Sequence, residues 1–227
     1  VYEHHQMWKE AENAYRQAIW LYPKSAEAYM RLASMYVRQS RFDDALELAE
    51  EYKRMDPLND RVDGMISVIR EQRDQNRAFL ALQQRVAAGT NTTWNDYVQL
   101  AQVYEQQNNH TAAAALFDIM LDSPALTNIE PYQYMLSVLG PRQDIARVNR
   151  IFERLVQLRP NEWSFCLDWS FARFASGDIE AGFGCLDKAL ELDREKSVRR
   201  LAQDPRFAIL KSHPDEALRN RFLKYLE

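Results

Sequence analysis

The chain has 227 residues with a net charge of −4, and 46% of its residues are hydrophobic, while Gly and Pro number only 6 and 8. This composition supports a sizeable core built from helices with short connections. A negatively charged chain without clustered Lys and Arg argues against nucleic acid as a partner. No apolar stretch approaches the roughly 18 residues of a membrane-spanning helix, so this segment is not expected to insert directly into a membrane.

The first 25 residues read as half of a helical unit. Ala11, Tyr15, Ala18 and Pro23 fit the second helix of a pair and its end, whereas the first helix is mostly missing. The chain also begins at Val1 and not at Met. We therefore expect further repeats or another domain upstream in the natural protein.

The next segment contains a pattern that returns later in the chain. "RLASMYVRQSRFDDALELA", residues 31–49, has the same outline as "QLAQVYEQQNNHTAAAALF", residues 99–117, which starts 68 residues further on. In each half, apolar residues recur at i, i+3, i+4 and i+7, which indicates amphipathic helices. The small residues at 33, 45, 101 and 113 allow paired helices to approach closely. An offset of 68 is twice 34, which is the period of one helix-turn-helix repeat.

Residues 26–59 and 94–128 resemble the tetratricopeptide repeat family. The matching positions are Tyr29, Leu32, Ala33, Tyr36, Ala45 and Pro57 in the first segment, and Tyr97, Leu100, Ala101, Tyr104, Ala113 and Phe117 in the second. The resemblance implies an all-α fold, a right-handed superhelical solenoid of stacked helix-turn-helix repeats with a C-terminal helical cap.

The same phase divides the rest of the chain. It predicts a partial repeat in residues 1–25, full repeats at 26–59, 60–93, 94–128, 129–162 and 163–196, and capping helices at 197–227. Residues 60–93 match weakly, but their length and two helical patterns predict a hairpin with Ile66, Ile69, Phe79 and Val86 facing inward. Asp204-Pro205 and His213-Pro214 mark helix starts within the cap.

The sequence offers no chemistry for catalysis. It has no Gly-rich phosphate loop and no nucleophile motif, so we expect neither an enzyme nor a cofactor. His4-His5 are adjacent and point about 100° apart on a helix, which does not favour a metal site. Cys166 and Cys185 lie on the two helices of one repeat. They could pair as a disulfide, although buried free thiols are the commoner arrangement.

The leading hypothesis is a non-catalytic scaffold that binds a peptide or helix of a partner protein. In the resembling family, the first helix of each repeat lines a concave groove, and one subgroup there holds a C-terminal carboxylate with Lys and Asn. Those side chains are missing here, which argues against that mode of binding. The groove-facing positions hold Glu27, Met30, Ser34, Arg61, Gly64, Val68, Asn95, Val98 and Gln102.

Two parts of this surface differ in character. The middle repeats offer polar side chains, Gln102, Glu105 and Gln133, whereas the last repeat offers Leu167, Phe171 and Phe174. A partner would place an apolar anchor against that last group. The alternative is that the C-terminal cap covers Phe171 and Phe174.

Two further hypotheses stay open at this point. The segment could be the accessory region of a larger enzyme or membrane protein whose catalytic domain lies upstream, which the full open reading frame would reveal. It could also be a self-assembly module, a possible homo-oligomer, which light scattering over a concentration series would detect. The sequence leaves the cellular compartment undetermined.

Overall fold

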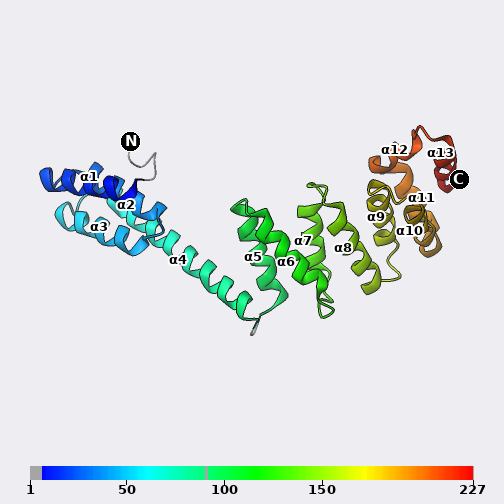
Figure 1. Cartoon of the computed structure of the whole chain (residues 1–227), viewed down its shortest axis with the longest axis horizontal. Helices are drawn as coiled ribbons and strands as arrows, with labels where there is room; N and C mark the ends of the chain where they lie inside the picture. Colours follow the sequence, from blue (N-terminus) through cyan, green and yellow to red (C-terminus); the bar gives the residue numbers. More distant parts are fainter. Residues whose placement is uncertain (1–6, 90–91, 227) are drawn as a thin grey trace. The chain divides into compact units, whose positions relative to one another are not determined.

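A computed structural model describes residues 7–89 and 92–226 (Figure 1). These residues form helices and connecting turns, with no strand among them, so the all-α prediction is confirmed. The chain divides into two compact units, residues 1–90 and 91–227, which are described separately below as unit 1 and unit 2.

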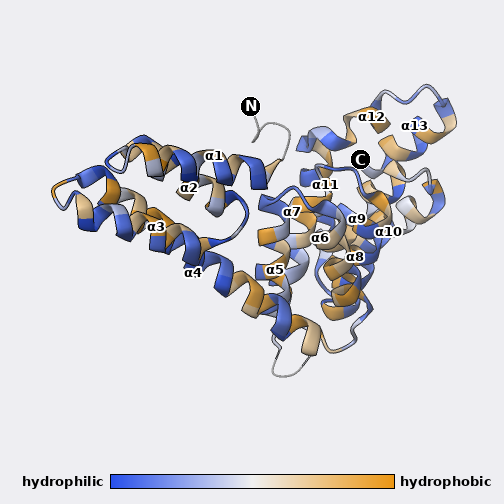
Figure 2. Ribbon diagram, turned by 60° about the vertical axis from the view of Figure 1, so that its left-hand side comes forward, coloured by the Kyte–Doolittle hydropathy of each residue, from blue (hydrophilic) through white to orange (hydrophobic). Residues whose placement is uncertain are grey.

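Unit 1 contains four helices packed in chain order, α1 against α2, α2 against α3 and α3 against α4. Their bounds are α1 Trp8–Leu21, α2 Ala26–Arg38, α3 Phe42–Met55 and α4 Asp60–Ala88. The helices are amphipathic, as Figure 2 shows by the hydrophobic and hydrophilic residues alternating along them. The residues of the repeat pattern form the core of the unit: Leu32, Ala33, Tyr36 and Ala45 are at most 2% exposed.

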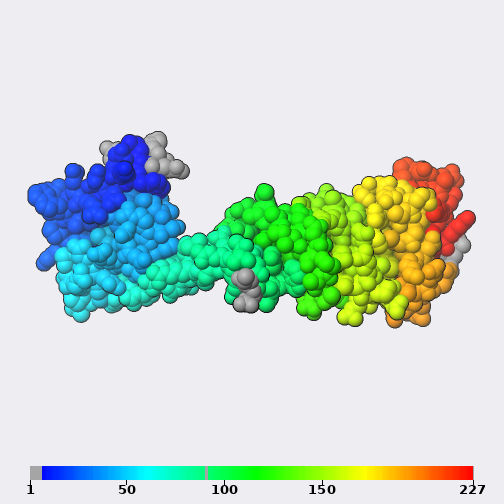
Figure 3. All heavy atoms as spheres, turned by 60° about the horizontal axis from the view of Figure 1, so that its bottom comes forward, coloured from blue at the N-terminus to red at the C-terminus, as the bar shows by residue number. Residues whose placement is uncertain are grey.

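Unit 2 continues the same arrangement in hairpins. Its elements are α5 Trp94–Gln106, α6 His110–Asp122, α7 Glu130–Leu139, α8 Ile145–Leu158, α9 Trp163–Ala175, α10 Ile179–Leu192, α11 Arg194–Gln203, η2 Pro205–Phe207, α12 Ala208–Lys211, α13 Glu216–Leu223 and η3 Lys224–Leu226. Figure 3 shows these segments following one another through unit 2, from green to red. Ala101 and Ala113, two small residues of the pattern, are 0% exposed. Each unit is thus a short all-α solenoid, while the right-handed superhelix stays a prediction.

One turn conformation closes four of the hairpins. A residue in the left-handed region follows the first helix, and the next backbone N–H donates to a carbonyl five residues earlier. The left-handed residues are Ser40, Asn108, Gln143 and Gly177, with φ values of 59°, 58°, 56° and 78°. The corresponding N–H···O distances are 2.9, 2.8, 3.2 and 3.0 Å. This arrangement satisfies carbonyls that a helix end leaves unpaired, and it turns the chain back toward the preceding helix.

The hairpin predicted for residues 60–93 is wrong, because this segment forms the single 29-residue helix α4. Residues 60–88 contain no left-handed position, and α4 ends only at Gly89 with φ 65°. The stretch "REQRDQNRAFLALQ", residues 70–83, consists almost entirely of good helix formers, with neither Gly nor Pro to stop it. Ile66 and Ile69 are buried as predicted, at 8% and 3% exposure, while Phe79 and Val86 are half-buried.

The C-terminal helices cover the end of the last hairpin. The cap begins at Arg194, three residues before the predicted boundary, because the Asp193 side chain accepts the Lys196 N–H and starts α11 there. Phe207 of η2 and Phe222 of α13 are 0% exposed and join the core of α9 and α10. A terminal element of this kind shields a stacking surface that would otherwise face water.

Glu12 ties three elements of unit 1 together. Its carboxylate accepts hydrogen bonds from the Tyr36 hydroxyl at 2.9 Å and from Arg41 at 3.0 Å, and it also pairs with Arg16. Burial acts to raise the pKa of Glu12, but the hydrogen bonds from Tyr36, Arg41 and Arg16 together lower it. The charged form of Glu12 therefore stabilises the folded state.

We expect the Glu12→Gln variant to lose part of the acid sensitivity of unit 1. Because the pKa of Glu12 is lower in the folded state, its contribution is complete above the unfolded value, near 4.5, and is lost as pH falls through the folded value. At pH 7 the substitution should cost about 1 kcal/mol. Urea unfolding at pH 7 and at successively lower pH measures the difference. Glu10→Gln, on the exposed side of the same helix, is the matched control. Equal pH dependence in wild type and Glu12→Gln would contradict this role.

Two glycines of α10 provide a second test of packing. A Cβ at Gly182 would lie 2.6 Å from the Phe174 ring, whereas a Cβ at Gly184 would meet nothing within 4 Å. We therefore expect Gly182→Ala to destabilise unit 2 by about 1–3 kcal/mol. Gly184→Ala should stabilise it by up to about 1 kcal/mol through helix propensity. Thermal unfolding of both variants checks this, and a shift of the same sign in both would be inconsistent with close contact at Gly182.

Candidate functional site

A groove of about 600 Å³ runs between α2 and α4 in unit 1. Its lining residues are Met30, Ser34, Val37 and Arg38 from α2, and Arg61, Gly64, Met65, Val68, Ile69 and Gln72 from α4. Most of the surface inside the groove is therefore apolar, with Arg38, Arg61 and Gln72 as the longer polar side chains among its lining. We call this surface the α2/α4 groove.

Helical spacing explains why these residues meet. On α4, the lining residues form two neighbouring rows at four-residue spacing, so they lie along one face. The rows are Arg61, Met65 and Ile69, and Gly64, Val68 and Gln72. Ile69 is 3% exposed and forms part of the floor, whereas Val68 is 52% exposed. Gly64 has no side chain, and the position of its missing Cβ borders open space. The groove is therefore open beside position 64, where a residue larger than glycine would project into it.

A model of a known protein family matches the part of the chain that contains α2 and α3. Residues 3–60 match a family model described as tetratricopeptide repeat. Residues 3–60 are therefore similar to tetratricopeptide repeats. The matched segment includes the whole hairpin α2–α3, so the resemblance carried by Leu32, Ala33, Tyr36 and Ala45 is confirmed. One wall of the α2/α4 groove, α2, lies within the matched segment, whereas α4 begins at its last residue.

Several solved structures match this chain at low sequence identity. One is the C-terminal part of a TPR repeat-containing protein from Cytophaga hutchinsonii, with 16% identity over 99% of this chain and 91% of that chain, at a TM-score of 0.43. Another is YrrB, described as a TPR protein with an unusual peptide-binding site, with 13% identity over 93% and 98% of the two chains, at 0.36. A third comes from Parabacteroides merdae, with 15% identity over 99% and 94%, at 0.31. A search of curated proteins found no match.

The structure gives the predicted groove residues different surroundings. Met30, Ser34, Arg61, Gly64 and Val68 line the α2/α4 groove together. Val98 is half-buried and Gln102 is exposed on α5, and Gln133 is exposed on α7, which packs against α5. For these three residues a role in partner binding stays a prediction.

Glu105 is already engaged within unit 2. Its carboxylate accepts hydrogen bonds from both terminal nitrogens of Arg142, one of them at 2.7 Å. A carboxylate oxygen also lies 3.0 Å from His110 Nδ1. The hydrogen bonds from Arg142 lower the pKa of Glu105. Its side chain is only 13% exposed, so its main contacts tie the α5 hairpin to the turn before α8.

The apolar group predicted for the last repeat faces the C-terminal cap and does not form an open groove. Leu167 is 0% exposed, the Phe171 ring packs edge-on against Phe207 at 5.9 Å, and Phe174 packs against Phe183 at 5.1 Å. Leu167 is therefore buried and not open to a partner, whereas Phe171 and Phe174 are half-buried and their role as an anchor stays a prediction. The contact of Phe171 with Phe207 agrees with the alternative that the cap covers Phe171. Apolar character alone could not distinguish the two, since a core and an anchor need the same residue types.

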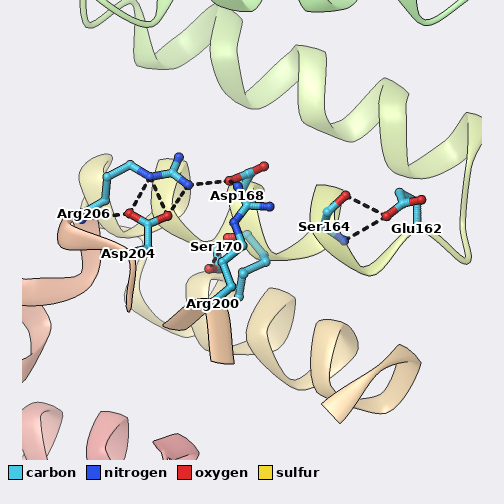
Figure 4. Close-up of polar contacts among 8 residues, drawn as sticks. Glu162, Ser164, Asp168, Ser170, Arg200, Asp204 and Arg206 are labelled. Atoms are coloured by element: carbon cyan, nitrogen blue, oxygen red, sulfur yellow. Dashed lines mark hydrogen bonds and ion pairs between the residues drawn. The ribbon is translucent and has the colours of Figure 1, made fainter. Parts of the chain in front are cut away.

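Polar contacts hold the cap on this face (Figure 4). Asp168 of α9 accepts a hydrogen bond from Arg200 of α11 at 2.7 Å and another from Arg206 of η2 at 2.6 Å. Arg206 also pairs with Asp204 and lies over the Phe171 ring, 5.2 Å from its centroid. These guanidinium contacts cross from the cap to α9, so they cover Phe171 from the solvent side.

Sequence reasoning missed several residues of the α2/α4 groove. Val37, Arg38, Met65, Ile69 and Gln72 line it but were not among the predicted positions. The missed residues are neighbours of the predicted ones on the surfaces of α2 and α4. In addition, α4 continues as one helix past residue 70, within the segment where a hairpin was predicted. Three- and four-residue spacing along an unbroken helix is the signal that could have found them.

The remaining candidate features do not form a reactive centre. Cys166 and Cys185 are free, and burial raises the pKa of both thiols, that of Cys185 to about 11. Within residues 7–89 and 92–226, no group of three or more His, Cys, Asp and Glu is placed to hold a metal ion. His4 and His5 lie outside those residues. None of the helices in the described part has the length and apolar content needed to cross a membrane.

Proposed function

We propose that this chain is a non-catalytic protein-interaction scaffold, and that unit 1 binds a peptide or helix of a partner protein in the α2/α4 groove. Tetratricopeptide repeats generally serve as interaction scaffolds. The observation that carries the proposal is the open, largely apolar groove of about 600 Å³ with Val68 52% exposed at its surface. Covering such a surface with the apolar face of a partner removes it from water, which favours association.

The composition of the groove indicates what it accepts. Met30 and Met65 have flexible, polarizable side chains that adapt to different apolar shapes. Gly64 leaves room for a bulky partner side chain beside Val68. An amphipathic segment with apolar residues at i, i+3 or i+4 therefore suits the groove, since both of its walls are helices.

Peptide display on the immobilised chain tests the proposal, followed by fluorescence anisotropy with each recovered peptide. We expect Val68→Asp to weaken binding about tenfold or more, because it places a charge in an apolar contact. Leu58→Asp is the matched control, since Leu58 is 91% exposed and lies outside the groove. Circular dichroism verifies that both variants are folded.

Two outcomes of this experiment would refute the assignment. Peptides that bind wild type and Val68→Asp equally do not use the groove. A concentration-dependent increase in mass by light scattering that Val68→Asp abolishes would instead show the groove occupied by a second copy of the chain.

A further inference from the structure

A second cavity of unit 1 lies on the other side of α2, between α1 and α3. It measures about 390 Å³, and its lining residues are Arg16, Ile19, Trp20, Leu32, Tyr36, Asp44, Glu47, Leu48 and Glu51. Leu32 and Tyr36 are buried residues of α2 and form part of this lining. They are about 165° around α2 from the residues of the α2/α4 groove, so the two surfaces are distinct. We call this cavity the α1/α3 seam.

Unit 2 contains the equivalent seam between α6 and α8, where ion pairs close it. Asp118 of α6 accepts hydrogen bonds from Arg147 at 2.7 Å and from Arg150 at 2.9 Å, both on α8. Arg150 also donates to Asp122 at 2.5 Å. The hydrogen bonds from Arg147 lower the pKa of Asp118. In this seam, arginine side chains of α8 therefore bridge the two helices and neutralise carboxylates of α6.

The repeat register shows that unit 1 carries the opposite charge at four of the five equivalent positions and a tryptophan at the fifth. Moving back 102 residues from α6 places Arg16 at the position of Asp118 and Trp20 at that of Asp122. Moving back 103 residues from α8, one more because of an extra residue between the hairpins, places Asp44, Glu47 and Glu51 at the positions of Arg147, Arg150 and Arg154. The α1/α3 seam therefore has carboxylates where the α6/α8 seam has guanidinium groups.

The reversed charges do not close the α1/α3 seam. Arg16 is directed to Glu12 and to the Tyr36 hydroxyl, at 3.1 and 3.0 Å, and Asp44 pairs with Arg41 at 2.5 Å. Glu51 accepts only a long hydrogen bond from Tyr29, at 3.4 Å. Trp20 is left 80% exposed beside Glu47, which is also exposed.

We propose that the α1/α3 seam binds an arginine side chain presented by a basic segment of a partner protein. Glu47 and Glu51 are four residues apart, so both carboxylates lie on the same face of α3. A guanidinium group can pair with these carboxylates and stack its flat face on the exposed Trp20 indole. In the equivalent seam of unit 2, guanidinium–carboxylate pairs of this kind form within the chain, between Arg150 and both Asp118 and Asp122. Leu48 and Ile19 line the same seam and suit an apolar residue next to the arginine.

Arginine is favoured over lysine by the same geometry. A guanidinium is planar, offers several donors at once and stacks well on aromatic rings, whereas an ammonium is a compact point charge. The seam combines two carboxylates, which can accept hydrogen bonds from a guanidinium, with an indole on which the guanidinium can stack. A probe with lysine in place of arginine should therefore bind several-fold more weakly.

Fluorescence anisotropy with three labelled probe peptides tests this binding. The probes alternate leucine with arginine, lysine or glutamate and are otherwise identical. We expect the arginine probe to bind best to the wild-type chain, and to lose about tenfold or more of its affinity with Trp20→Ala and with Glu47→Lys. Both residues are exposed, so the variants should remain folded.

Two controls separate this site from general charge attraction and from the α2/α4 groove. Glu10→Lys makes the same charge change on an exposed position of α1 outside the seam and should leave affinity nearly unchanged. Val68→Asp disables the α2/α4 groove and should also have little effect on this probe. The proposal is overturned if either Trp20→Ala or Glu47→Lys binds the arginine probe like wild type. It is equally overturned if Glu10→Lys loses as much affinity as Glu47→Lys.

Discussion

Replacing Phe207 with alanine is expected to lower the free energy of unfolding of unit 2 by about 3–5 kcal/mol, the cost of truncating a buried aromatic residue. Phe207 is 0% exposed, stacks on Phe222 with a centroid distance of 6.1 Å, and contacts Phe171 edge-on. Truncating Phe207 would leave a cavity between the cap and α9. Urea unfolding monitored by circular dichroism measures the loss.

The matched control for this prediction is Ile209→Ala. Ile209 follows two residues later but is 67% exposed, so its truncation should change stability by no more than about 0.5 kcal/mol. Limited proteolysis provides an independent readout, since loosening the cap in Phe207→Ala should expose cleavage sites after Arg194, Arg199 and Arg200. Equal stability losses in the two variants would show that Phe207 does not anchor the cap.

The second large effect is expected within α4. A proline at Gln75 removes a backbone donor in the middle of a helix and clashes with the preceding turn, at a cost of about 3 kcal/mol or more. Gln75 is exposed, so lost side-chain packing contributes little. Urea unfolding of Gln75→Pro against Gln75→Ala measures the backbone effect alone.

A pair of glycine variants distinguishes a continuous helix from a turn at the same place. Ser40 is in the left-handed region with φ 59°, and Asp74, 34 residues later, is within α4. Ser40→Gly should stabilise the chain slightly, because glycine adopts that conformation without steric cost. Asp74→Gly should destabilise it by roughly 0.5–1 kcal/mol. Stabilisation by both substitutions would show that residues 73–76 turn as the repeat pattern first indicated.

The contrast between these positions explains which parts of the fold the sequence could predict. At residues 40, 108 and 177 the hairpin turn is marked locally by Ser, Asn or Gly between two amphipathic patterns. Residue 74 lies one period of 34 after Ser40, inside the segment where a hairpin was predicted, but Arg, Glu and Gln on both sides favour a helix. Local helix propensity prevailed over the period because no residue near Asp74 ends a helix.

The candidate sites were predictable only in part. Periodicity placed Met30 and Val68 on the face that lines the α2/α4 groove, since that inference needs only the helical repeat. It could not tell that Phe171 packs under Phe207, because this contact joins residues from separate elements whose docking depends on the shape of the cap. Trp20 and Glu47 lie on α1 and α3, which are second helices of their repeats, so the pattern of groove-facing first helices does not include them; only a comparison of charges 102 and 103 residues apart singles them out.

The core of unit 1 also has a consequence for biosynthesis. The buried residues of its main core cluster run from Ala11 to Ile69, so the contacts within this cluster need no residue that is translated later. At typical synthesis rates of about 5–20 residues per second, the ribosome needs several seconds to make the rest of the chain. Helical hairpins built from contacts close in sequence form in far less time than that. The core cluster of unit 1 can therefore reach its native packing on the nascent chain while unit 2 is still being made.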